Sequence, residues 1–252
     1  MEHLIETALL THGLRSVTNE ELRQTWTDKA ENIAWISEGE IVTGDIERYL
    51  KFRDKAESLI RIDCEILENA MKEKLSGALT ASGTMAVCEK LGIPLAVTCG
   101  MGGIGDIKGE KLCADLPALE QIPVALISTG PKDMLDRKET ISWLIQHKVM
   151  VLGAWRDYCT GYIFSGEKVE LQGVYENEYR VPMLILNEIP EEKRVRDRSI
   201  LEEAICEGKR AELNGRYYHP AVNGKIDELT DGYSSRIQLE SLLENARYAN
   251  QM

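Results

Sequence analysis

Short apolar runs alternate with amphipathic stretches along the chain from residue 77 onward. The stretch from Leu79 to Leu91 has helical spacing and ends at Gly92, which is a natural C-terminal cap. Short continuous apolar runs, which are typical of strands buried on both faces, predict strands at 94–98, 123–128, 149–152 and 183–186. Further helices are predicted at 137–147, at about 192–213 and at about 233–250. This alternation indicates an α/β fold in which helices cover the sheet.

Two segments carry weaker patterns. Residues 17–57 are polar and charged apart from the apolar piece Ile33–Ile36, which precedes a turn-like Glu38-Gly39 pair. This predicts a helix, a short strand and a helix on the outside of the core. Residues 214–232 contain Asn-Gly, His-Pro and Asp-Gly pairs, which favour turns, so a loop is expected there.

Length and composition limit the class of protein. The chain has 252 residues, 43% of them hydrophobic, which is enough for one large domain or two small ones. No run of 18 apolar residues is present, and the N-terminus has no basic segment leading into an apolar one. We therefore expect neither a membrane span nor a signal peptide, and we expect a cytoplasmic protein.

Charge and cysteine usage exclude two further classes. A net charge of −12 and scattered basic residues argue against binding to a nucleic acid polymer, although a single nucleotide in a local pocket stays compatible with them. The six cysteines form no CxxC pair, so a structural zinc site is not expected.

The glycine-rich segment from Thr98 to Gly105 is the strongest local signal for a ligand site. It follows a predicted strand, and ligands of α/β folds bind beyond the carboxyl ends of strands. Glycine lets backbone amides approach a ligand closely. Gly100, Gly102 and Gly105 match GxGxxG, but no helix clearly opens there, which argues against a dinucleotide site. A surface loop without function is the alternative.

Three charged residues at predicted strand or helix ends have alternative interpretations. Lys132 follows a buried strand, where desolvation would make a neutral amine available to attack a carbonyl, but a solvated lysine is the commoner case. Asp115 could bind a hard cation or cap the helix that begins near Pro117. Glu6 lies in an apolar run and is either an acid with a raised pKa or an edge residue.

The order and spacing of these motifs resemble one family, the pseudouridine-5′-phosphate glycosidases, also called indigoidine synthase A-like proteins. The segments that carry the resemblance are Glu6–Leu14, Gly77–Met85, Leu91–Gly103, Ala114–Leu119, Pro123–Lys132, Leu186–Glu192 and Asn245–Arg247. The separation between Asp115 and Lys132 matches that of the family without a gap. The resemblance covers essentially the whole chain and implies a single layered α/β/α domain over residues 1–252.

The resemblance also implies an activity. Members of the family interconvert pseudouridine 5′-phosphate with uracil and ribose 5-phosphate, and they are manganese-dependent homotrimers. By resemblance, Lys132 forms an imine with the ring-opened sugar and Glu6 transfers a proton. Asp115 would hold Mn²⁺, or Mg²⁺, largely through water. Small-molecule ligands are therefore expected: a C-nucleoside or its 5′-phosphate, a ribose-type sugar and a nucleobase.

The same resemblance assigns substrate-binding positions, and four of them depart from the family. Thr80, Ala81, Thr98 and Gly100 match positions beside the substrate. The departures are Arg61 for a lysine and Asp63 for a serine in the phosphate-binding stretch, Cys113 for a serine, and Gln238 for an asparagine. The negative charge of Asp63 would repel phosphate, which favours an altered or non-phosphorylated sugar, whereas Arg61 would still hold phosphate if Asp63 points away.

Several functions stay open at this point. The enzyme would cleave a C–C glycosidic bond, or form one as a synthase in a C-nucleoside natural-product pathway. A catalytically silent protein that binds a nucleoside or sugar on the same fold is a second hypothesis. An unrelated phosphosugar aldolase or isomerase with a Schiff-base lysine is a third.

Overall fold

The computed structural model describes residues 1–105 and 112–252. In these residues the main sheet has nine strands: β1 (His3–Ile5), β2 (Ile33–Ser37), β3 (Glu40–Gly44), β4 (Ile60–Ile62), β5 (Gly77–Leu79), β6 (Leu95–Val97), β8 (Ala125–Ser128), β10 (Met150–Gly153) and β13 (Met183–Leu186). Their order is β10-β13-β8-β6-β1-β2-β5-β4, with β3 paired to β2. The pairs from β10 to β2 are all parallel, and β2 is antiparallel to β3 and β5.

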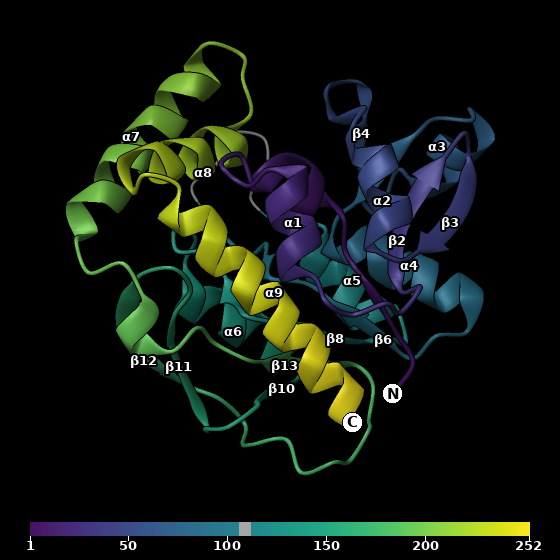
Figure 1. The fold of residues 1–252 in the computed structure, drawn as a ribbon. Coiled ribbons are helices and arrows are strands. Elements are labelled where there is room, and N and C mark those ends of the chain that lie inside the picture. The colour runs from purple at the N-terminus through teal and green to yellow at the C-terminus, as the bar shows by residue number, and fades with distance from the viewer. Residues whose placement is uncertain (106–111) are drawn as a thin grey trace.

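Helices cover the two faces of this sheet (Figure 1). One face carries α3 (Leu67–Lys72), α4 (Ala81–Leu91), α5 (Asp115–Gln121) and α6 (Arg137–Gln146). The other carries α1 (Asn19–Thr25), α2 (Ile46–Arg53), α7 (Arg198–Leu213), α8 (Tyr218–Leu229) and α9 (Tyr233–Gln251). Successive strand residues enter opposite cores, as Leu4 and Ile5 do. The layered α/β/α fold predicted from the sequence is confirmed.

Shorter elements complete the part of the chain that the structure describes. Two small sheets pair β7 (Gly100–Met101) with β9 (Gly130–Pro131) and β11 (Tyr158–Gly161) with β12 (Ser165–Glu170). A single π-helical turn, η1 (Leu9–Gly13), follows β1, and two 3₁₀ turns are η2 (Ala56–Ser58) and η3 (Glu191–Lys193). Among the described residues, no helix combines the length and the apolar character needed to cross a membrane.

The carboxyl ends of β1, β5, β6 and β8 meet at one edge. β1 ends where β2 begins, because Ile5 pairs with Ile33, and the antiparallel partner β5 therefore returns to the end of β1. The Thr7 amide donates to the Leu79 carbonyl at 3.2 Å, and the Leu79 amide donates to Thr7 Oγ1 at 2.9 Å. The loops that follow four strands thus surround one point.

The segment 17–57 departs from its prediction. The expected strand is the first half of a hairpin, because Glu38 and Gly39 both have positive φ, 51° and 81°, as a tight two-residue turn requires. The second half, β3, contains the β-branched run Ile41–Thr43, which was not separated from the helix expected after the turn. β2 lies inside the sheet between β1 and β5, not outside the core.

The prediction of a loop at 214–232 was wrong, because α8 occupies most of it. Tyr218, Val222 and Ile226 recur every four residues and are buried. They pack on α7, where a Cβ on Gly208 would come within 2.4 Å of the Val222 side chain, so close helix contact requires glycine. Pro220 falls in the first turn, where a missing N–H costs nothing. This packing overrides the local turn signals.

Candidate active site

Most of the predicted site residues surround one small cavity of about 40 Å³ at the convergent strand ends. Its lining residues are Glu6, Leu9, Gly13, Arg61, Thr80, Ala81, Gly100, Asp115, Lys132, Tyr162 and Asn223. Three larger hollows elsewhere, of about 610, 390 and 320 Å³, contain none of the predicted site residues. The small cavity is therefore the candidate site, because it is lined by the predicted site residues and lies at the carboxyl ends of the strands.

Glu6 is a buried carboxylate poised to exchange a proton near neutral pH. It follows β1 directly, and its amide donates to the Val97 carbonyl at 3.0 Å, so backbone pairing fixes its place. Burial raises its pKa from 4.5 to about 7, and the nearby charges of Lys132 and Arg61 oppose that rise. The side chain can therefore be populated in both protonation states at neutral pH.

Lys132 is held by the small sheet of β7 and β9. Gly100 pairs with Gly130 in this sheet, and the Lys132 amide donates to the Met101 carbonyl at 3.2 Å. The next residue, Asp133, accepts backbone hydrogen bonds from residues 162–164 at 2.7 to 3.0 Å. Burial raises the pKa of Asp133, and these three donors oppose that rise. The lysine thus projects from a backbone that is fixed on both sides.

Asp115 connects two loops of the site. Its Oδ1 accepts from the Ser82 amide at 2.9 Å and its Oδ2 from the Gly102 amide at 2.8 Å, and all of these groups are buried. Asp115 is the first residue of α5 and does not cap that helix through its side chain. Instead, its carboxylate lies at the N-terminus of α4, where the helix dipole favours negative charge.

The residues predicted to meet the 5′ end of the sugar have different positions. Arg61 lines the cavity and is largely exposed. Asp63 does not line the cavity, because its Oδ1 accepts from the amides of Glu65 and Ile66, each at 3.0 Å. No ion pair joins Arg61 to Asp63 in the part of the chain that the structure describes. Of the two cases that the sequence left open, the structure has the one in which Asp63 points away.

The remaining predicted contacts divide into two groups. Thr80, Ala81 and Gly100 line the cavity, and Thr80 Oγ1 also caps α4 by accepting from the Gly83 amide at 3.3 Å. Thr98 is buried beside Glu6, where it slightly lowers the pKa of the Glu6 carboxyl. Its hydroxyl has no hydrogen bond of ordinary geometry within the described residues.

Cys113 and Gln238 are not lining residues. Cys113 lies against Gly102, where an added Cβ would come within 2.1 Å of the cysteine Sγ, so it shapes the glycine loop from behind. Gln238 is buried, and its Oε1 accepts from the Tyr162 hydroxyl at 2.8 Å. Gln238 therefore reaches the cavity only through Tyr162.

Sequence reasoning missed Tyr162 and Asn223, which line the cavity, and Asp133, which supports it. The ring of Tyr162 lies on Gly100, where a Cβ would approach the ring within 2.6 Å. Burial raises the pKa of Tyr162 well above its usual value, so the phenol stays neutral. Asn223 belongs to the helix that was predicted as a loop. The apolar residues Tyr218, Val222 and Ile226, which recur every four positions, were the one sequence signal for this helix.

The residues that the structure describes could hold a divalent cation only as a hydrated ion. Among the described residues, no group of three or more His, Cys, Asp or Glu side chains is arranged to hold a metal. Asp115 supplies one buried carboxylate, and each oxygen keeps a lone pair beyond the backbone hydrogen bond that it accepts. One carboxylate suffices for Mg²⁺ or Mn²⁺ when the ion keeps several waters.

Comparison with known proteins identifies the family. The family model described as indigoidine synthase A like protein matches residues 4–252. The chain belongs to this family. Among curated relatives, pseudouridine-5′-phosphate glycosidase of Petrotoga mobilis is 27% identical, over 96% of this chain and 88% of its own. The protein of the same name from Caldanaerobacter subterraneus subsp. tengcongensis is 29% identical, over 96% and 87%.

Two solved structures have the same fold as this chain. An indigoidine synthase A-like protein from Thermotoga maritima superposes with a TM-score of 0.78 at 21% identity, over 99% of this chain and 91% of that one. Prealnumycin C-glycosynthase AlnA, in complex with ribulose 5-phosphate, superposes with a TM-score of 0.77 at 22% identity, over 98% and 88%. At these identities the likeness supports the α/β/α architecture alone.

Proposed function

We propose that this chain is a C-glycosidase of the lyase type that cleaves the C–C glycosidic bond of pseudouridine 5′-phosphate or a closely related C-nucleoside phosphate. The observation that carries the proposal is the meeting of Glu6, Asp115 and Lys132 around one cavity. The curated relatives named above are pseudouridine-5′-phosphate glycosidases, which supports the same substrate class.

The proposed chemistry runs through Lys132. A C–C bond leaves no heteroatom to protonate, so the pair of carboxylates that serves ordinary glycosidases would not suffice. The Lys132 nitrogen bonds to the anomeric carbon as the bond from that carbon to the ring oxygen breaks, and the freed oxygen takes up a proton. The nitrogen lone pair then forms an imine as the bond to the base breaks, and the base carbon takes up a proton. Water hydrolyses the imine, which releases the sugar aldehyde and returns the amine.

Glu6 is the proposed proton carrier. Its pKa of about 7 lets the same side chain give a proton to the leaving base and take one from the sugar. The positive charges of Lys132 and Arg61 act on it from within the site, so changes in the lysine during imine formation would alter the acidity of Glu6. This coupling suits an acid–base group that must act in both directions.

The 5′ end of the sugar is proposed to carry phosphate. Arg61 lines the cavity, and a guanidinium binds phosphate oxygens in bidentate fashion. The carboxylate of Asp63, which favoured a neutral sugar in the sequence, is engaged by two backbone amides outside the cavity. The repulsion expected from Asp63 is therefore weaker than its position in the sequence suggested.

A hydrated Mn²⁺ or Mg²⁺ at Asp115 is part of the proposal. Glu6 and Asp115 balance Lys132 and Arg61 in formal charge, so a phosphate dianion would leave the loaded site negative. A divalent cation would offset that charge and stabilise oxyanions of the open sugar. Asp115 would hold it through water or through its remaining lone pairs.

Synthesis is the second candidate, because each step is reversible and the imine can accept the electron pair of a base carbon. The structural neighbour AlnA is a C-glycosynthase bound to ribulose 5-phosphate, which favours keeping this direction open. A homotrimeric assembly and a cytoplasmic location stay predictions.

The test is an assay in both directions with Mn²⁺ present. Purified enzyme is expected to convert pseudouridine 5′-phosphate to equal amounts of uracil and ribose 5-phosphate, and to condense the two products. Pseudouridine should be a poorer substrate. A folded protein that converts neither compound in either direction would contradict the proposal and favour the silent binding protein.

A further inference from the structure

One amide that lines the cavity has no hydrogen-bond partner in the described part of the chain. Asn223 of α8 lines the same small cavity as Arg61 and is half-buried. Its carboxamide makes no hydrogen bond or other polar interaction with any residue in 1–105 or 112–252. An asparagine side chain offers two N–H donors and one acceptor, so this group is available to a ligand.

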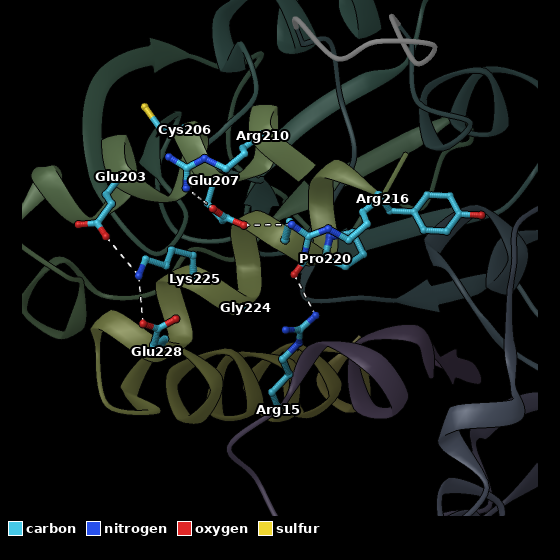
Figure 2. A pocket seen from close by; sticks show the side chains of 12 residues that line it. Arg15, Glu203, Cys206, Glu207, Arg210, Arg216, Pro220, Gly224, Lys225 and Glu228 are labelled. Atoms are coloured by element: carbon cyan, nitrogen blue, oxygen red, sulfur yellow. Dashed lines mark hydrogen bonds and ion pairs between the residues drawn. The ribbon is translucent and has the colours of Figure 1, made fainter. Parts of the chain in front are cut away.

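The helix that bears Asn223 is fixed against the segment that follows η1. Arg15 Nη2 donates to the Pro220 carbonyl at 3.1 Å, as Figure 2 shows. The guanidinium also lies on Gly224, where an added Cβ would come within 2.3 Å of Arg15 Nη1. Ser16 Oγ donates to Asp227 Oδ2 at 2.6 Å. The position of the amide is therefore set by the fold and not by a mobile loop.

The charge around this amide favours an anion. Arg61 makes no ion pair with a carboxylate in the described part of the chain. Asp63 instead accepts hydrogen bonds from the backbone amides of Glu65 and Ile66. Burial and the charge of Arg61 lower the pKa of His12 to about 4, so this neighbour is neutral at neutral pH. Glu6 is buried and Lys132 is half-buried, whereas Arg61, which lines the same cavity, is largely exposed.

We propose that Asn223 is a specificity-determining residue that donates its amide N–H to the 5′-phosphate of the sugar beside Arg61. The inference rests on the proposed function and adds to it the second group that recognises the phosphate. Arg61 supplies charge from an exposed side chain, and a neutral amide on a helix fixed by the fold adds a second, directional contact. Together they would select a phosphorylated sugar over its free alcohol.

The experiment compares kcat/KM for pseudouridine 5′-phosphate and for pseudouridine in wild type, Asn223→Leu and Asn223→Asp. Leucine removes the donor at similar size, and we expect the preference for phosphate to fall about tenfold, through KM. Aspartate adds a like charge near the phosphate, and we expect a loss of about a hundredfold for the phosphorylated substrate alone. Activity on pseudouridine should change little in either variant.

Glu228→Gln is the matched control, because Glu228 is exposed on the same helix and pairs with Lys225 at the surface. It should leave both activities unchanged. An unchanged ratio in Asn223→Asp, with wild-type thermal stability, would overturn the role of Asn223 and leave the proposed function standing. Equal loss on both substrates would mean that Asn223 acts only through the packing of α8. A wild type inactive on both substrates would instead refute the proposed function.

Discussion

The Asp115 carboxylate accepts a hydrogen bond from the Ser82 amide at 2.9 Å. The first residue of α5 thus provides an acceptor for a backbone amide in the first turn of α4. Its second oxygen holds the Gly102 amide of the glycine loop at 2.8 Å. One side chain thus joins the two loops that follow β5 and β6. The alternatives offered by the sequence, a cap of α5 or a cation ligand, did not include this bridging role.

The bridge predicts a structural cost for Asp115→Ala. The substitution leaves two buried amides without acceptors, and each such donor costs about 1–3 kcal/mol. We expect the free energy of unfolding to fall by roughly 3 kcal/mol in urea titrations. Glu120→Ala, on the exposed face of the same helix, should change it little. Equal stability of Asp115→Ala and wild type would show that the two hydrogen bonds are not made in solution.

Glu6 predicts a dependence of stability on pH. Its pKa rises from 4.5 to about 7 on folding, so between these values the folded protein retains a proton that the unfolded chain releases. The free energy of unfolding should therefore fall as pH rises from about 4.5 to 7 and then level off. A shift of this size corresponds to about 3 kcal/mol.

Glu6→Gln should remove that dependence and with it the proton transfer. The variant should match wild type at pH 4, exceed its stability at pH 8 by up to about 3 kcal/mol, and be inactive. Urea titrations at both pH values measure this, and Glu2→Gln, at an exposed position, is the control. Parallel pH profiles for wild type and Glu6→Gln would contradict the burial of an ionisable Glu6.

Asp115 also predicts a response to metal. Chelation with EDTA should lower kcat/KM, and Mn²⁺ should restore it, because the phosphate-loaded site needs positive charge. Mn²⁺ should also raise the thermal midpoint of wild type, as a ligand that binds only the folded state does, and should raise that of Asp115→Asn less. Full activity after chelation would leave Asp115 with a structural role only.

The sequence predicted the strands and helices that bury continuous or periodic apolar residues. The αL cap at Gly92, with φ of 70°, was predicted because glycine adopts positive φ at a helix C-terminus without strain. α8 was missed because its turn-forming residue pairs outweighed a short apolar stripe, and because its packing on Gly208 of α7 is a long-range contact. β3 was missed because its short run of strand-forming residues is identified as a strand only by its antiparallel pairing with β2.

The same distinction applies to the site. Glu6, Asp115 and Lys132 were found because their order and spacing resemble a family, and the structure brings them to one cavity. Tyr162 was missed because its place depends on the missing side chain of Gly100, which lies far away in the chain. The sequence left the orientation of Asp63 open, because it depends on hydrogen bonds from two backbone amides, which only the structure shows.

Covalent trapping tests the central claim, that Lys132 forms an imine with the sugar. Enzyme is incubated with ribose 5-phosphate, reduced with borohydride, and examined by intact mass and peptide mapping. Lys138→Ala, at an exposed lysine on α6, serves as the control and should trap and turn over as wild type does. We expect one sugar adduct on Lys132, and a folded Lys132→Ala variant with neither adduct nor turnover. An adduct on another lysine, or full activity of Lys132→Ala, would contradict imine formation at Lys132.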